Sequence, residues 1–150
     1  MKDRKLRKII TVLIVLALVF IWGHSAMSAE ESSEESGFIY ELITPFLEIF
    51  FGKGNVTEHL VRKLAHFTEH MELSVLFVLW TGLGKEKGNQ VYVNCWFQSM
   101  FVALFDETIQ LFSGRGSMVS DVWIDVAGAT TGWILTLGLL KLLEGKRKRS

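Results

Sequence analysis

The chain has little cysteine and little proline: one of each, Cys95 and Pro45, in 150 residues. A single cysteine excludes a disulfide within the chain and a zinc site built on paired cysteines. A single proline leaves long stretches free to form uninterrupted helices. Charged residues make up only 21% of the chain and hydrophobic residues 49%, which is more apolar than an ordinary soluble domain of this size and favours a membrane protein.

Four apolar segments are long enough to cross a bilayer, which takes about 20 helical residues. They run from about residue 9 to 27, from 64 to 83, from 91 to 112 and from 122 to 143. We therefore predict an all-α integral membrane bundle of four transmembrane helices, formed by residues 1–150 as a single domain.

The formal net charge is zero, but the charges are unevenly distributed. Basic residues crowd both ends of the chain, while residues 30–58 are mostly acidic. Because positive charge favours the cytoplasmic side, this pattern predicts a multi-pass membrane protein with an N-in/C-in topology. The first apolar segment, followed by Ala26-Met27-Ser28-Ala29, also fits a cleaved secretory signal, and both interpretations stay open.

The segment between the first two spans is predicted to be external and partly helical. Ser32 and Glu35 have the spacing of a capping box, and apolar residues then recur at near-helical spacing. Pro45 is expected to break or bend this stretch. We predict an external interfacial segment of helical pieces, lying on the outer leaflet or against the bundle. Asn55, together with Glu58, is expected to cap the helix that follows.

Polar side chains gather at the external ends of the last three predicted spans. They are Lys63, His66, Glu69 and His70, then Asp106, Glu107 and Gln110, then Arg115 in a glycine-containing turn, and finally Asp121 and Asp125. A charge in hydrocarbon costs roughly 2.5–3.5 kcal/mol, so such groups are normally paired, hydrated or functional. Gly128 and Gly132 continue the face of the two last aspartates, and this small-residue spacing predicts a close helix contact that turns the aspartates into the bundle.

This pattern resembles the VanZ-like family of small bacterial membrane proteins over about residues 9–140. The similar elements are Lys63-Leu64-Ala65-His66-Phe67 with Glu69, Asp106-Glu107 with Gln110 and Phe112, Gly114-Arg115, and Asp121-Val122 with Asp125 and Gly128. The resemblance implies a multi-pass protein of the bacterial cell membrane with a role in the cell envelope, since the namesake is associated with reduced susceptibility to the glycopeptide antibiotic teicoplanin. It carries over His66, Glu107, Gln110, Arg115, Asp121 and Asp125 as site positions. In two respects the chain departs from the family: His70 stands where an aromatic residue is common, and the turn before Arg115 lacks a frequent proline.

Two interpretations of the polar residues need no metal ion. In the first, they form an internal ion-pair network, in which Arg115 bridges Glu107 and Asp121 while His66 pairs with Glu69 or Asp106. In the second, they bind an anionic lipid-linked or cell-wall precursor. Lys63 and Arg115 would then hold the head group, and Glu107, Asp121 and His66 would be the candidates for hydrogen bonding or general acid–base catalysis. Because five carboxylates outnumber Lys63 and Arg115, the charge count favours a functional site.

A third interpretation rests on His66-Phe67-Thr68-Glu69-His70, which matches the H-x-x-E-H pattern of zinc hydrolases. His66 and His70 would bind zinc, Glu69 would act as base, and Glu107 or Asp125 would be a third ligand. A proton- or ion-coupled transporter is a fourth interpretation. Zinc is the only cofactor that enters these alternatives, and the expected partners are the bilayer and a lipid-linked precursor, with no nucleic acid. The sequence leaves the ligand, the oligomeric state and any catalytic activity open.

Overall fold

The computed structural model describes residues 2–84, 88–114 and 119–147, which form five α-helices and no strand. The helices are α1 (Lys2–Ser25), α2 (Ala29–Phe51), α3 (Glu58–Gly82), α4 (Asn89–Phe112) and α5 (Val119–Arg147). The predicted all-α fold is confirmed, and the four apolar segments fall on α1, α3, α4 and α5.

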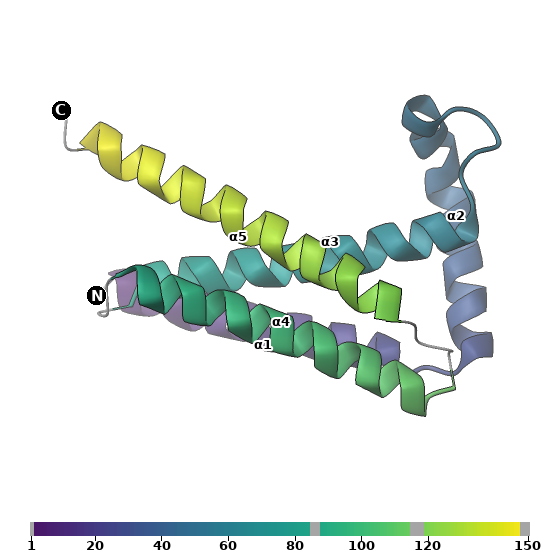
Figure 1. Cartoon of the computed structure of the whole chain (residues 1–150), viewed down its shortest axis with the longest axis horizontal. Helices are drawn as coiled ribbons and strands as arrows, with labels where there is room; N and C mark the ends of the chain where they lie inside the picture. The colour runs from purple at the N-terminus through teal and green to yellow at the C-terminus, as the bar shows by residue number, and fades with distance from the viewer. Residues whose placement is uncertain (1, 85–87, 115–118, 148–150) are drawn as a thin grey trace.

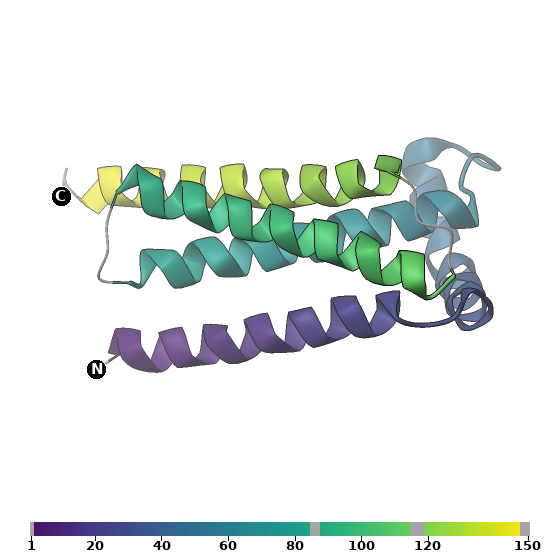
Figure 2. The same cartoon turned by 60° about the horizontal axis from the view of Figure 1, so that its bottom comes forward.

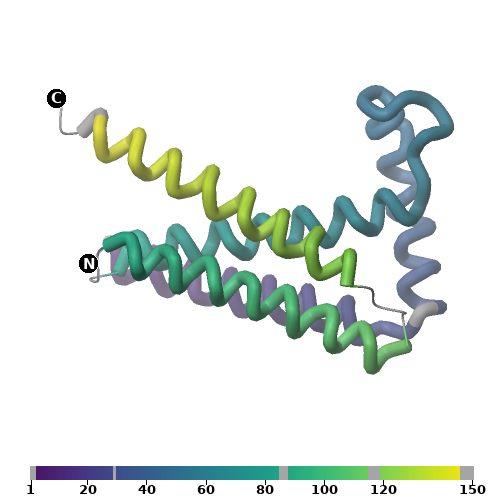
Figure 3. Tube along the Cα trace, viewed as in Figure 1, coloured from purple at the N-terminus to yellow at the C-terminus, as the bar shows by residue number. Residues whose placement is uncertain are grey.

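Four of the helices form an elongated bundle, and the fifth lies across its end. α1, α3 and α4 run side by side, and α5 packs on α3 (Figures 1 and 2). α5 diverges from the other helices towards its C-terminal end, whereas α2 is transverse to all of them (Figure 3). α1 begins and α5 ends at the side of the bundle opposite α2 (Figure 1). An even number of membrane crossings would place the two termini in this way.

A small apolar core joins α1 to its neighbours, while the outer faces of the bundle stay apolar and exposed. Buried members of the core are Ile10, Ile14 and Ile21 of α1, Leu73 of α3 and Val102 of α4. Exposed apolar side chains on the outside include Val12, Leu16 and Val19 of α1, Phe97, Phe101 and Leu104 of α4, and Leu135, Leu139 and Leu142 of α5. Extended apolar surface of this kind marks a face that meets lipid or another protein.

Two of the described helices are long and apolar enough to cross a membrane. They are α1, over Asp3–Ser25, and α5, over Val119–Gly145. α3 carries Glu69 and Glu72 in its middle part, in addition to Glu58, Arg62 and Lys63 near its start.

The predicted small-residue contact lies between α5 and α3. A Cβ atom at Gly128 would overlap the carbonyl oxygen of Phe67, and a Cβ atom at Gly132 would overlap the carbonyl oxygen of Met71. Both glycines are therefore required for the backbones to approach this closely, as the spacing predicts. The contact fixes α5 against the part of α3 that carries His66 and His70.

α2 is one helix, and the prediction of separate pieces was wrong. The capping box predicted at Ser32 and Glu35 was also wrong by about one turn, because the N-cap of α2 is Ser28. The Ser28 hydroxyl accepts a hydrogen bond from the Glu31 amide, and the Glu31 carboxylate accepts one from the Ser28 amide at 2.9 Å. Pro45 lies inside α2. Its ring removes one backbone hydrogen bond, but the helix continues for another turn and a half and ends where the Gly52 amide bonds to the Glu48 carbonyl.

The predicted cap of α3 was also wrong, because Thr57 rather than Asn55 occupies the N-cap. The Thr57 hydroxyl accepts a hydrogen bond from the Leu60 amide at 3.2 Å. The side-chain amide of Asn55 instead donates a hydrogen bond to the carbonyl of Phe51 at 2.9 Å, so it caps a backbone carbonyl at the C-terminal end of α2.

Hydrogen bonds hold α2 against the start of α3. Arg62 Nε donates to the Ser36 hydroxyl at 3.3 Å, and the Tyr40 hydroxyl donates to the Val56 carbonyl at 3.2 Å. α2 therefore covers the end of the bundle at which the polar residues of α3, α4 and α5 lie.

Candidate functional site

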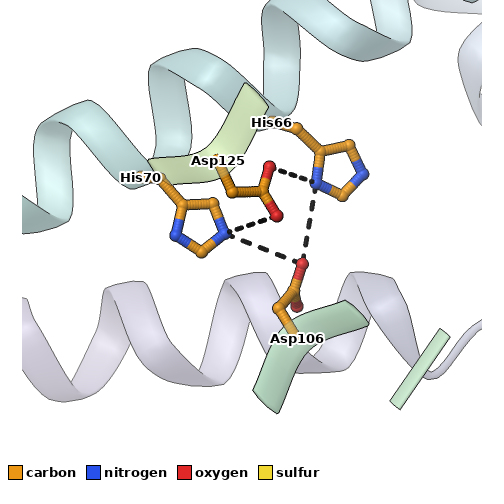
Figure 4. Close-up of side chains that lie close together, drawn as sticks. All are labelled: His66, His70, Asp106 and Asp125. Atoms are coloured by element: carbon orange, nitrogen blue, oxygen red, sulfur yellow. Dashed lines mark ion pairs between the residues drawn. The ribbon is translucent and has the colours of Figure 1, made fainter. Parts of the chain in front are cut away.

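Four ionisable side chains from three helices meet inside the bundle. His66 and His70 are one turn apart on α3, so they lie on one face and meet Asp106 of α4 and Asp125 of α5. His66 Nδ1 is 3.6 Å from Asp106 Oδ2 and 3.6 Å from Asp125 Oδ1. His70 Nε2 is 3.7 Å from Asp106 Oδ2 and 3.4 Å from Asp125 Oδ2. Figure 4 shows Asp125 between the two rings, with Asp106 reaching the same place from α4. We call these four residues the His–Asp cluster.

The His–Asp cluster is almost closed to solvent. His70, Asp106 and Asp125 are 0% exposed and His66 is 7% exposed. Among the described residues, no hydrogen bond reaches either carboxylate oxygen of Asp125 or either ring nitrogen of His70. Buried polar atoms normally have such partners, and their absence here points to a group or a proton that the protein side chains do not supply.

A buried amide borders the cluster. Gln110 Nε2 lies 3.2 Å from Asp106 Oδ2, 3.2 Å from Glu107 Oε1 and 3.4 Å from the Ser25 hydroxyl. The spacings of four and three residues on α4 place the Gln110 amide beside the carboxylates of Asp106 and Glu107. Ser25 belongs to the last turn of α1, so the amide connects α1 to α4 beside the cluster.

Lys63 and Asp121 lie at the edge of this polar region. Lys63 Nζ is 3.7 Å from Asp121 Oδ1, and both side chains are partly exposed. Asp121 thus pairs with Lys63, whereas the ion-pair hypothesis assigned it to Arg115. Arg115 is outside the described residues, and so are its expected contacts with Glu107 and Asp121. Glu69 lies on α3 between the two histidines in sequence but is not part of the His–Asp cluster.

The residues of this polar region fall within a match to a known family. A family model described as VanZ/LLP1 matches residues 10–141. This chain belongs to the VanZ/LLP1 family. The resemblance inferred from the polar pattern is therefore confirmed. Neither a curated protein nor a solved structure matches the chain.

In this VanZ/LLP1 protein, the site positions carried over from the family lie at the end of the bundle that α2 covers. The described ones are His66, Glu107, Gln110, Asp121 and Asp125. His70, at which the chain departs from the family pattern, is a central member of the His–Asp cluster.

The sequence interpretation missed a second polar contact next to the cluster. His24 Nε2 of α1 lies 3.3 Å from Glu35 Oε2 of α2, and the His24 ring centroid is 6.1 Å from that of His66. The available signal was the pair of polar residues, His24 and Ser25, that ends the first apolar segment. These two residues do not indicate which side chain would pair with His24, because Glu35 belongs to α2, whose direction the sequence does not specify.

The His–Asp cluster offers two imidazole nitrogens and two carboxylates, with the donor atoms all within 4.8 Å of one another. The charge of this set can be balanced by two protons shared among the four side chains or by one divalent cation. In the first case the protons lie on the histidines, which then pair with ionised aspartates, or on the aspartates. In the second case neutral histidines and ionised aspartates surround the cation.

Proposed function

We propose that this VanZ/LLP1 protein is a multi-pass protein of the bacterial cell envelope that binds the anionic head group of a lipid-linked cell-wall precursor. α1, α3, α4 and α5 would span the membrane with both termini in the cytoplasm. The end covered by α2 would then face the outer leaflet, where such precursors are used.

The membrane part of the proposal is supported by family membership and by the two apolar helices. It is also supported by the exposed phenylalanines Phe97, Phe101 and Phe105 on α4, which would meet the acyl chains. α3 carries more charge than a lipid-facing helix tolerates, but His66 and His70 are buried in the bundle and Glu69 is half-buried, which leaves Glu72 as the exposed acidic residue of its middle part. A helix of this kind can cross a membrane because its neighbours shield the polar face.

A single observation supports the binding role: polar groups from three helices converge inside the bundle at the end that α2 covers, with Lys63 at the partly exposed edge. Lys63 would bind the phosphate of the precursor, and Arg115 would add a bidentate guanidinium contact. Glu107 and Asp121 would accept hydrogen bonds from sugar or amide groups. By sequestering a precursor at this end, the protein would lower the susceptibility of the cell to glycopeptides such as teicoplanin.

The proposal is tested by native mass spectrometry of the full chain purified in a mild detergent. We expect a lipid-linked, phosphate-containing molecule to copurify with the wild type and to be lost from Lys63→Ala and Arg115→Ala. Lys53→Ala is the matched control, because Lys53 is an exposed lysine of the loop between α2 and α3. Teicoplanin susceptibility is then measured in cells that express each variant at equal protein level.

Retention of the lipid by Lys63→Ala and Arg115→Ala, or its loss from Lys53→Ala to the same degree, would contradict the assigned contacts. A wild-type protein that carries no such lipid and leaves teicoplanin susceptibility unchanged would refute the proposed function itself.

A further inference from the structure

We propose that the His–Asp cluster is a binding site for one divalent transition-metal ion, best matched by zinc, with His66, His70, Asp106 and Asp125 as its ligands. This site is distinct from the proposed head-group contacts, which use Lys63 and Arg115.

The spacing of the donor atoms fits a metal ion better than direct hydrogen bonds. The four nitrogen–oxygen distances run from 3.4 to 3.7 Å. Hydrogen bonds between such atoms are normally about 2.7–3.2 Å long, so these pairs are too far apart for good ones. Zinc bonds of about 2.0–2.1 Å in a tetrahedron place neighbouring ligand atoms roughly 3.3–3.4 Å apart. A small inward shift of the side chains therefore converts the observed spacing into that of a tetrahedral zinc site.

The charge of the cluster also fits a divalent ion. Among the described residues, the ion-pair partners of Asp106 and Asp125 are only His66 and His70. Two carboxylates without a lysine or arginine partner, in a site with almost no solvent, carry a high desolvation cost. One doubly charged cation bound by two carboxylates and two neutral imidazoles leaves the site without net charge.

The type of ligand selects among metals. Magnesium and calcium bind through oxygen atoms and rarely use imidazole. Zinc accepts imidazole nitrogen and carboxylate oxygen together, and two histidines at positions i and i+4 of one helix are a common part of its sites. Cobalt(II) takes the same geometry and serves as a spectroscopic probe.

The ligand set assigns the ion a structural role. Four protein ligands fill a tetrahedral site, whereas a catalytic zinc keeps one position open for water or substrate. The ligands come from α3, α4 and α5, so the ion would join three helices beneath the end that α2 covers. Glu69, the expected base of the H-x-x-E-H pattern, then has no metal-bound water to act on. Asp106 and Asp125 complete the ligand set that the two histidines begin.

The experiment uses the full chain in a mild detergent, stripped with a chelator and then equilibrated with zinc chloride. We expect about one zinc per chain by inductively coupled plasma mass spectrometry. His70→Ala and Asp125→Asn should weaken zinc binding by more than about 100-fold, because loss of a group that only orients a ligand already costs roughly 10–100-fold. Glu69→Gln and His59→Ala, the latter an exposed histidine of α3, should bind zinc as the wild type does.

A further variant distinguishes loss of the metal ligands from a failure of the variant protein to fold. Asp125→His keeps four donor groups, so it should retain the metal and show a changed visible absorption spectrum with cobalt(II). The metal site is refuted if the folded wild type takes up neither zinc nor cobalt. Protons shared among the four side chains would then balance the charge of the cluster. The metal site is equally refuted if Glu69→Gln abolishes binding while Asp125→Asn does not.

The two proposals can fail separately. Lys63→Ala should lose the lipid and keep zinc. A protein that binds zinc but no lipid would refute only the head-group role, and one that binds lipid without zinc would refute only the metal site.

Discussion

Replacement of Gly128 by alanine tests whether the α3–α5 contact positions the site. Helix propensity alone predicts a gain, because alanine is favoured over glycine by about 0.8–1.0 kcal/mol in a helix interior. The structure predicts the opposite. The new Cβ atom would overlap the carbonyl oxygen of Phe67, which belongs to the backbone and cannot rotate away.

The two effects can be separated by comparison with Gly138 on the same helix. A Cβ atom at Gly138 meets no described atom within 4 Å, so Gly138→Ala should show the propensity term alone, a gain of up to about 1 kcal/mol. Overpacking of a tight contact typically costs about 1–3 kcal/mol. Both variants gain the same helix propensity, so Gly128→Ala should be less stable than Gly138→Ala by the overpacking cost, about 1–3 kcal/mol.

The assay is reversible unfolding of the purified protein in mixed detergent micelles with an increasing fraction of dodecyl sulfate, followed by tryptophan fluorescence. Gly132→Ala should repeat the effect, because its Cβ atom would overlap the Met71 carbonyl oxygen. If Gly128→Ala proves as stable as Gly138→Ala, then the close approach of α3 and α5 is not what holds the bundle together.

Two further predictions concern the helix caps. Thr57→Ala removes the hydroxyl that accepts the hydrogen bond of the Leu60 amide, so it should lower the free energy of unfolding by about 0.5–2 kcal/mol, measured in the same micelles, with Thr57→Ser as the variant that restores it. At the start of α2, hydrogen bonds from the Ser28 amide and hydroxyl hold the pKa of Glu31 below its ordinary value. A carboxyl group whose pKa is lower in the folded state stabilises the fold at neutral pH, and this contribution is lost as the pH falls through the lowered pKa. The difference in stability between wild type and Glu31→Gln should therefore shrink on acidification, and a difference that stays constant from neutral to acidic pH would contradict the assignment.

Part of the polar site was predictable because it depends on spacing along a single helix. The repeat of the α-helix alone places His66 and His70 on one face, and it brings Gln110 next to Asp106 and Glu107. The small-residue spacing of Gly128 and Gly132 correctly indicated a close helix contact. The local errors, at the caps of α2 and α3, arose where several polar residues in a row could each serve as cap.

The partners of the two histidines were not predictable in the same way. The motif placed Glu69 with His66 and His70, and Glu107 or Asp125 was the expected third ligand. In the structure, the expected pair of His66 with Asp106 and the expected approach of Asp125 are found. Asp106 and Asp125 each meet both rings, however, and Glu69 is not among the four. Which carboxylate meets the histidines depends on how far α4 and α5 are rotated and shifted relative to α3, and no spacing within one helix contains that information.

The sequence by itself thus determined the helices, their apolar outer faces and the gathering of polar residues at one end, because these follow from the composition and period of each segment. Only the tertiary structure decided the His–Asp cluster. Gly128 and Gly132 rest on the carbonyl groups of Phe67 and Met71, the residues that directly follow His66 and His70. This contact sets the position of α5 along the axis of α3. Asp125 lies one turn before Gly128, so the contact brings its carboxylate to the two imidazole rings.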